Sequence, residues 1–198
     1  MPRRDGLEDY RSKRDFQQTS EPGARRGGRT PEAPRFVVQK HDARSLHYDF
    51  RLESDGVLKS WAVPKGPPTD PSEKVLATPT EDHPLEYEHF EGVIPQGEYG
   101  AGPVVVWDTG TYHNITEDHG EPVPMAEALR RGHVAVRLEG KKLRGDYALT
   151  KMRRRDTPGW LLVKMRDDKA GTGPDPRRDR PESVRSGRTL RQLKRDAD

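Results

Sequence analysis

Residues 41–53, HDARSLHYDFRLE, decide the fold of this chain. Large apolar residues occupy every second position from residue 46 to residue 52, and the positions between them hold His47, Asp49 and Arg51. Successive side chains point to opposite faces of a strand, so the pattern predicts an antiparallel strand with one buried face. The next three residues, Ser54-Asp55-Gly56, predict a tight hairpin turn.

Outward from this hairpin, residues 35–166 read as short strands broken by turns. The expected strands are 35–40, 46–53, 57–64, 74–78, 85–92, 103–108, 133–140, 147–152 and 160–165. One helix is expected in VPMAEALRRG, with a proline near its start and Gly132 at its C-terminal cap. This organisation predicts a mostly β domain, either a single compact β-barrel or a tightly curved sandwich.

The two ends of the chain are more polar than this segment. Of all 198 residues, 30% are hydrophobic and 35% are charged, which is too polar for a core that uses the whole length. We therefore expect an N-terminal arm, 1–34, that is partly disordered, a β domain, 35–166, and a polar basic tail, 167–198, that is disordered. A short helix or clamp is expected within GLEDYRSKRDF of the arm.

Composition also limits the function classes. The chain has no cysteine, so any metal must be held by His, Asp or Glu. It has neither an apolar run of ~18 residues nor the apolar stretch of a signal peptide, and we expect a cytoplasmic protein without a membrane span. The net charge of +3 permits a nucleic-acid partner but does not require one, because 33 acidic residues are interspersed with 36 basic ones.

The polar face of residues 46–53 is a candidate metal and phosphate site. Its side chains lie about 6 to 7 Å apart along the strand, so His47 and Asp49 can bind one cation while Arg51 binds phosphate oxygens. His41 can fold back across the turn as a third ligand. Such a set accepts Mn²⁺, Fe²⁺ or Zn²⁺. The alternative is a solvated ion-paired face without a metal, and the residues of this strand alone favour neither.

Three further segments bear on this site. Lys65 lies in a Pro/Gly-rich turn of WAVPKGPP and can reach a phosphate. His83 precedes a proline and is held extended, with Tyr87 four residues on. GVIPQGEYGAG, residues 92–102, reads as a shaped loop, but it lacks the strand-to-helix context of a nucleotide-binding loop. The other histidines show no partner pattern and are expected to be surface or structural residues.

Together these motifs resemble the 3′-phosphoesterase domain of bacterial DNA ligase D and its free-standing relatives. The resemblance runs through FVVQKHDARSLHYDFRLE, LKSWAVPKGP, EDHPLEYEHFEG, GVIPQGEYGAGPVVVWDTGTY and GWLLVKM, over about residues 35 to 166. It extends to EDYRSKRDFQQTSEP in the arm. The resemblance implies an eight-stranded β-barrel with a positively charged groove. It also implies a Mn²⁺-dependent enzyme, with Co²⁺ or Zn²⁺ as other metals, that removes a 3′-terminal ribonucleoside and then the remaining 3′-phosphate at primer-template ends.

The resemblance also implies roles for individual residues. The metal ligands would be His41, His47 and Asp49. The other catalytic residues would be Arg51 and His83 on the phosphate, Tyr87 beside the metal, and Gln39 and Lys65 in support. Residues needed mainly for ribonucleoside removal would be Arg14, Asp15 and Glu21. Val75 departs from the pattern, because some relatives have an arginine there that contacts phosphate or backbone.

The expected setting is DNA end-joining repair in a bacterial or archaeal nucleoid, as a monomer. A separate DNA ligase, polymerase or Ku-type end-binding protein would be the protein partner. His83 could also protonate the leaving oxygen. Two alternatives are a non-catalytic β-barrel adaptor that binds nucleic-acid ends for a ligase and a metal-dependent hydrolase of small phosphorylated metabolites. A damaged metal trio would favour the adaptor, and a closed pocket would favour the small-molecule hydrolase.

Overall fold

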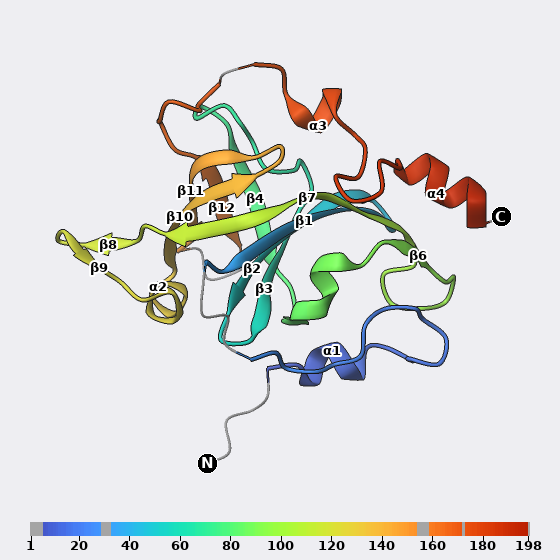
Figure 1. Ribbon diagram of the computed structural model, residues 1–198. Helices are drawn as coiled ribbons and strands as arrows, with labels where there is room; N and C mark the ends of the chain where they lie inside the picture. Colours follow the sequence, from blue (N-terminus) through green and yellow to red (C-terminus); the bar gives the residue numbers. More distant parts are fainter. Residues whose placement is uncertain (1–5, 29–32, 154–158, 172, 198) are drawn as a thin grey trace, which may run out of the picture.

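A computed structural model describes residues 6–28, 33–153, 159–171 and 173–197. Its main feature is a closed antiparallel barrel of eight strands (Figure 1). In order around the barrel the strands are β1 (Arg35–Asp42), β2 (Leu46–Ser54), β3 (Val57–Val63), β4 (Lys74–Pro79), β12 (Trp160–Lys164), β11 (Arg144–Lys151), β10 (His133–Gly140) and β7 (Gly102–Asn114). Pairing of β1 with β7 closes the ring and confirms the barrel rather than the tightly curved sandwich.

Shorter elements decorate the barrel. Strand β6 (Gly92–Ile94) pairs with β7, β5 (His83–Pro84) pairs with β3, and β8 (Glu117–Asp118) pairs with β9 (Glu121–Pro122). The helices are α1 (Glu8–Ser12), the 3₁₀ helix η1 (Leu85–His89), α2 (Met125–Arg131), α3 (Pro176–Asp179) and α4 (Leu190–Ala197). Among the described residues, no helix is long and apolar enough to cross a membrane.

The barrel interior is formed by alternate residues of the strands, as the period of two predicts. Tyr48, Phe50 and Leu52 are buried there against Trp61 and Trp107. Leu46 does not belong to this interior, since 46% of it is exposed. The prediction that Leu46 is buried is therefore wrong, because β2 begins beyond the packed end of the barrel.

A second apolar cluster covers the outer face of β1 and β2. Tyr10 of the arm and Tyr87 of η1 pack there with Val37 of β1. The polar side of β2 is therefore not exposed to solvent: only 6% of Asp49 and 3% of Arg51 are exposed. Burial of two charged side chains requires partners, and these partners form the site described below.

Local sequence signals succeeded for α2 and failed for residues 85–92. Gly132 ends α2 with φ of 84°, and its N–H bonds to the carbonyls of Ala128 and Leu129. The strand predicted over 85–92 is wrong: this stretch begins with η1. Its alternation of apolar and polar residues resembles a strand. However, the Gln39 side-chain amide donates hydrogen bonds to two backbone carbonyls of this segment, and the backbone forms a 3₁₀ turn instead.

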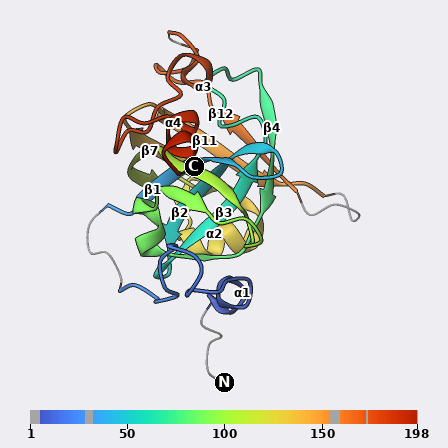
Figure 2. The same cartoon turned by 90° about the vertical axis from the view of Figure 1, so that its right-hand side faces the viewer.

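Both ends of the chain contact the barrel where the structure describes them. In both views α1 lies below the barrel and α3 above it, and in Figure 1 α4 lies at the right-hand side of the barrel (Figures 1 and 2). The Trp107 indole donates to the Arg180 carbonyl at 2.9 Å, and the Val184 N–H bonds to the Val106 carbonyl at 2.9 Å. These anchors are backbone carbonyls, which hydrophobic patterning does not reveal.

Candidate active site

The first half of the candidate site is the β1–β2 hairpin. In its register His41 lies opposite His47, and Gln39 lies opposite Asp49. One ligand atom each of His41, His47 and Asp49 lies within 4.8 Å of the others. The hairpin thus brings together the three predicted metal ligands, which we call the metal trio.

Hydrogen bonds fix which nitrogen of each imidazole faces the trio. The His41 Nε2 lies 2.6 Å from the Gly100 carbonyl oxygen, and the His47 Nδ1 lies 3.0 Å from that of Ser45. A carbonyl only accepts, so these two nitrogens carry the hydrogens. The His41 Nδ1 and the His47 Nε2 are left as acceptors, 3.5 and 3.3 Å from the same oxygen of Asp49.

Three acceptors that converge without a hydrogen between them fit a cation. Backbone carbonyls on the outer nitrogens are the usual support of metal-bound histidines. Burial would raise the pKa of Asp49, but the Arg51 guanidinium holds it well below its ordinary value. Two nitrogens and one carboxylate with open positions suit Mn²⁺, Fe²⁺ or Zn²⁺ and do not select among them.

The second half of the site is a pair of guanidinium groups around His83. Arg51 Nη1 lies 3.1 Å from the His83 Nδ1, and Arg14 Nη2 lies 3.3 Å from its Nε2. The His83 Nδ1 is also 2.9 Å from the Glu81 carbonyl and must donate to it. The Nε2 is then free to accept from Arg14, while Arg51 Nη1 still has a hydrogen to offer another acceptor. Two buried cations around one imidazole form a positively charged cluster suited to an anion such as phosphate, and we call this Arg14–His83–Arg51 cluster the anion pocket.

His83 is neutral in this pocket. Burial lowers its pKa well below the ordinary value, and the positive charges of Arg51 and Arg14 lower it further. The single hydrogen of the neutral ring is on Nδ1 and points to the Glu81 carbonyl, so His83 has no spare proton to give. The structure therefore disfavours the idea that His83 protonates the leaving oxygen.

Two buried polar side chains hold the pocket in place. Gln39 accepts from Arg51 Nε at 2.7 Å and donates to the carbonyls of Tyr87 and Phe90 at 2.7 and 3.1 Å. Glu21 of the arm accepts from Arg14 Nε at 2.9 Å and from the Tyr87 hydroxyl at 2.7 Å. Burial and the Glu21 carboxylate raise the pKa of Tyr87 well above its ordinary value, so this hydroxyl remains a donor.

Tyr87 of η1 connects the arm with the rest of the site. The Arg51 guanidinium carbon lies 4.9 Å from the centroid of the Tyr87 ring. The His83 ring meets the same ring edge to face, with 4.6 Å between their centroids. The Tyr87 hydroxyl is directed to Glu21 rather than to the metal trio.

Two predicted site residues and the departure at Val75 lie apart from these contacts. Asp15 is exposed and its carboxylate accepts from the Gln17 N–H at 3.0 Å, which forms a local turn. Lys65 is exposed in the turn after β3, beyond the end of β2 that carries the metal trio. Val75 is 1% exposed in the barrel interior, so its side chain faces the core.

Sequence reasoning missed two contributors. The Glu81 side chain is only 3% exposed and forms ion pairs with Lys13 and Arg14, both at 3.2 Å. Its position in EDHP, two residues before a candidate histidine, was the available signal. The second is the Gly100 carbonyl on the His41 ring, and a backbone contact of this kind leaves no residue-type signal. The shaped loop 92–102 thus supports a metal ligand rather than a nucleotide.

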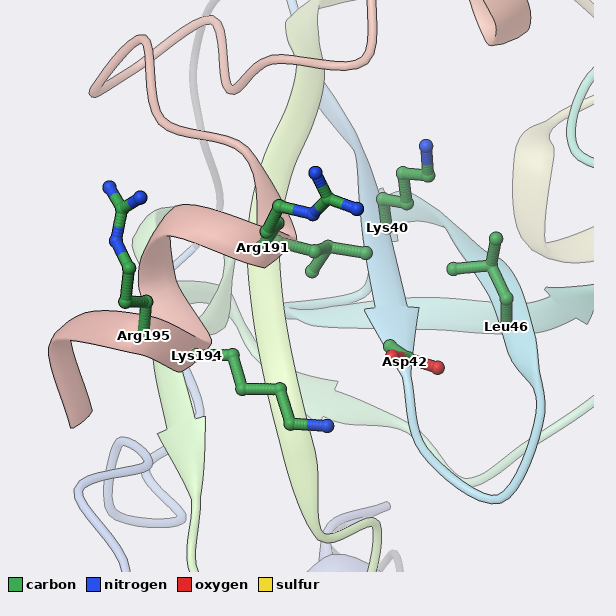
Figure 3. Close-up of a pocket in the computed structure, with 7 residues that line it drawn as sticks. Lys40, Asp42, Leu46, Arg191, Lys194 and Arg195 are labelled. Atoms are coloured by element: carbon green, nitrogen blue, oxygen red, sulfur yellow. The ribbon is translucent and has the colours of Figure 1, made fainter. Parts of the chain in front are cut away.

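A basic groove lies beside the hairpin. It has a volume of about 530 Å³ and is lined by Lys40, Asp42, Leu46, Leu190, Arg191, Lys194 and Arg195. Figure 3 shows the Arg191 and Lys194 side chains of α4 extending toward β1, where Lys40 and Asp42 lie. Lys40 and Asp42 flank His41 in sequence, so the groove lies on the opposite face of the hairpin from the metal trio.

Comparison with known proteins assigns the family. Residues 39–151 match the family model described as the DNA Ligase D 3′-phosphoesterase domain. The chain belongs to this family. Over 194 residues it is 48% identical to the multifunctional non-homologous end joining protein LigD of Pseudomonas aeruginosa, an alignment that covers 96% of this chain and 22% of that protein. Over 168 residues it is 46% identical to the protein of the same name from Mycobacterium bovis, with 85% and 21% covered.

The chain spans about a fifth of the length of these two LigD proteins. The stretch matched to the 3′-phosphoesterase family contains the metal trio, Arg51, His83 and Gln39. It leaves out the arm with Arg14 and Glu21 and the tail with α4. The resemblance drawn from the motifs is confirmed at the level of the family.

Proposed function

We propose that this chain is a divalent-metal-dependent 3′-phosphoesterase that prepares DNA 3′ ends for joining. The observation that carries the proposal is the convergence of three hydrogen-free acceptors, on His41, His47 and Asp49, next to the Arg14–His83–Arg51 pocket. A cation site beside an anion pocket is what phosphate-ester hydrolysis needs. Family membership and the end-joining relatives support the same substrate class.

Each side chain of the site has a separate role in the proposed hydrolysis. When Mn²⁺ or a related ion is bound by the trio, it supplies Lewis-acid polarisation of the phosphoryl group. Arg51 and Arg14 hold the other phosphate oxygens and stabilise charge in the transition state. His83, neutral, accepts from Arg14 and so helps to fix the position of this guanidinium. Gln39 keeps the Arg51 fork in place, and Tyr87 and Glu21 do the same for Arg14.

Two successive hydrolyses follow from the family resemblance. In the first, a water oxygen bonds to phosphorus, the bond from phosphorus to O5′ of the terminal ribonucleoside breaks, and O5′ leaves as a hydroxyl. The primer then ends in a 3′-phosphate. In the second, water attacks this phosphate and leaves a 3′-hydroxyl and inorganic phosphate. Because Arg14 and Glu21 sit on the arm, we assign the arm to the first step. Asp15 and Lys65 remain predicted contributors, at the arm and at the turn after β3.

The proposed setting is bacterial or archaeal end joining in the cytoplasm, with the primer-template 3′ end as substrate. A DNA ligase, a polymerase or a Ku-type protein would act on the same ends. A non-catalytic adaptor would have no use for three converging ligand atoms beside two buried guanidinium groups, and this supports the catalytic function over the adaptor.

The decisive experiment uses a labelled primer-template ending in a 3′-phosphate or in one 3′-ribonucleotide. Incubation with Mn²⁺ should convert both ends to a 3′-hydroxyl, and a chelator should stop the reaction. His47→Ala should abolish both steps, while His133→Ala, which changes an exposed histidine on β10, should behave like the wild type. An unchanged primer end in Mn²⁺ with enzyme in excess would exclude the enzymatic function and favour the adaptor.

A further inference from the structure

An exposed aromatic residue lies where the metal trio and the anion pocket meet. Tyr99 belongs to the loop between β6 and β7 and is 49% exposed. The next residue, Gly100, has φ of 76° and places its carbonyl 2.6 Å from the His41 ring. The loop that supports a metal ligand therefore also presents Tyr99 at the surface.

The other neighbours of Tyr99 come from the arm. Lys13 Nζ lies 4.8 Å from the ring centroid, and the Arg14 guanidinium carbon lies 5.6 Å from it. The same guanidinium reaches His83 at 3.3 Å and lies over the buried Tyr10 ring at 3.8 Å. Tyr99 thus precedes Gly100, whose carbonyl holds the His41 ring of the metal trio, and its own ring lies next to Arg14 of the anion pocket.

We propose that the Tyr99 ring is a stacking platform for the base of the terminal ribonucleoside that the first step removes. This inference rests on the proposed function and adds a nucleobase site to it. A phosphate held between Arg14 and Arg51 would carry its leaving nucleoside toward the arm. Two exposed aromatic side chains lie there: Phe16, which is 38% exposed and packs against Tyr10, and Tyr99, which is 49% exposed and lies beside the Arg14 guanidinium. Aromatic platforms bind unpaired bases with little sequence preference, because every base has a π-face.

The competing role for Tyr99 is structural. Its contacts with Lys13 and Arg14 could simply tether the arm to the loop, since cations over aromatic rings attract one another. A tether would act on the shape of the anion pocket and hence on every substrate. A base platform would act only on substrates whose leaving group carries a base.

The test compares three primer-template ends with wild type, Tyr99→Ala and Tyr99→Phe. The ends are a 3′-ribonucleotide, a 3′-ribose residue without a base, and a 3′-phosphate. Stacking of one base is worth about 5- to 150-fold in binding. Tyr99→Ala should therefore raise KM for the ribonucleotide end by about this factor with kcat nearly unchanged. Tyr99→Phe should resemble the wild type.

The other two ends decide between platform and tether. For the base-free ribose end, the wild type should already show the high KM, and Tyr99→Ala should add nothing. Release of the 3′-phosphate should be unaltered in all three proteins, which also shows that the variants are folded. Equal losses on all ends, or no loss on any, would overturn the platform. Absence of Mn²⁺-dependent activity in the wild type would instead overturn the proposed function.

Discussion

His41 and His47 lie directly opposite each other in the β1–β2 hairpin, and each donates its outer ring nitrogen to a backbone carbonyl. Their inner nitrogens both face one oxygen of Asp49. The carbonyls of Gly100 and Ser45 fix the tautomers of the two histidines. As a result, only hydrogen-bond acceptors face the space between the two rings and Asp49. Removal of one ring should therefore affect cation binding directly.

We expect His47→Ala to lower Mn²⁺ affinity at least about 100-fold, beyond what loss of an outer-sphere partner costs. Calorimetric titration of Mn²⁺ measures this, with His133→Ala as the matched control. Wild-type affinity in His47→Ala would mean that the cation does not bind at the trio.

Arg51→Lys should reduce both hydrolytic steps by at least about 100-fold. A lysine has no planar fork to bridge Gln39 and a phosphate together. Arg35→Lys, which changes a half-buried arginine paired with Glu88, is the control. Steady-state rates on the 3′-phosphate end provide the measurement, and near-normal rates for Arg51→Lys would remove the guanidinium from the mechanism.

Glu21→Ala should impair ribonucleoside removal more than phosphate release. Glu21 accepts hydrogen bonds from Arg14 and Tyr87. Its loss removes both bonds, so Arg14 is no longer fixed in the anion pocket, while the metal trio and Arg51 stay in place. Glu8→Ala, in an exposed position of α1, should leave the ratio of the two rates unchanged. Equal loss of both steps in Glu21→Ala would contradict the assignment of the arm to the first step.

The lowered pKa of His83 predicts that the free energy of unfolding depends on pH. Its pKa is lowered in the folded protein, so below about pH 6.5 the unfolded chain binds a proton that the folded protein does not. This contribution is fully present above pH 6.5 and is lost as the pH falls, by about 1 kcal/mol between pH 6.5 and 5.5. Denaturant unfolding at both pH values should show a smaller decrease for His83→Gln than for the wild type; equal decreases would mean that His83 is protonated when folded.

The basic groove predicts a salt effect. Arg191 and Lys194 have no ion pair in the part of the chain that the structure describes, and with Lys40 they line one groove. If they contact two phosphates of the duplex, Arg191→Ala/Lys194→Ala should reduce the slope of log affinity against log salt by about 2. Arg130→Ala/Arg178→Ala removes two cations from α2 and α3 and should leave the slope unchanged. An unchanged slope in the α4 variant would place the duplex elsewhere.

Much of the fold follows from local pattern. The alternation in residues 46–52 and the Ser54-Asp55-Gly56 turn predicted the central hairpin, and Gly132 predicted the end of α2. The same logic failed at residues 85–92, where a long-range contact from Gln39 competes with strand pairing. It also failed at Leu46, because a period of two does not show where the packed interior ends.

The sequence by itself determined that His47, Asp49 and Arg51 share a face, because strand periodicity is a local property. It also determined, through its motifs, the family. Only the tertiary structure decided that this face is buried, because the cover comes from α1, η1 and the loop after β6, which lie far away in the sequence. It likewise decided the histidine tautomers and the place of Tyr99, since backbone carbonyls and arm contacts meet these side chains only when the barrel has closed.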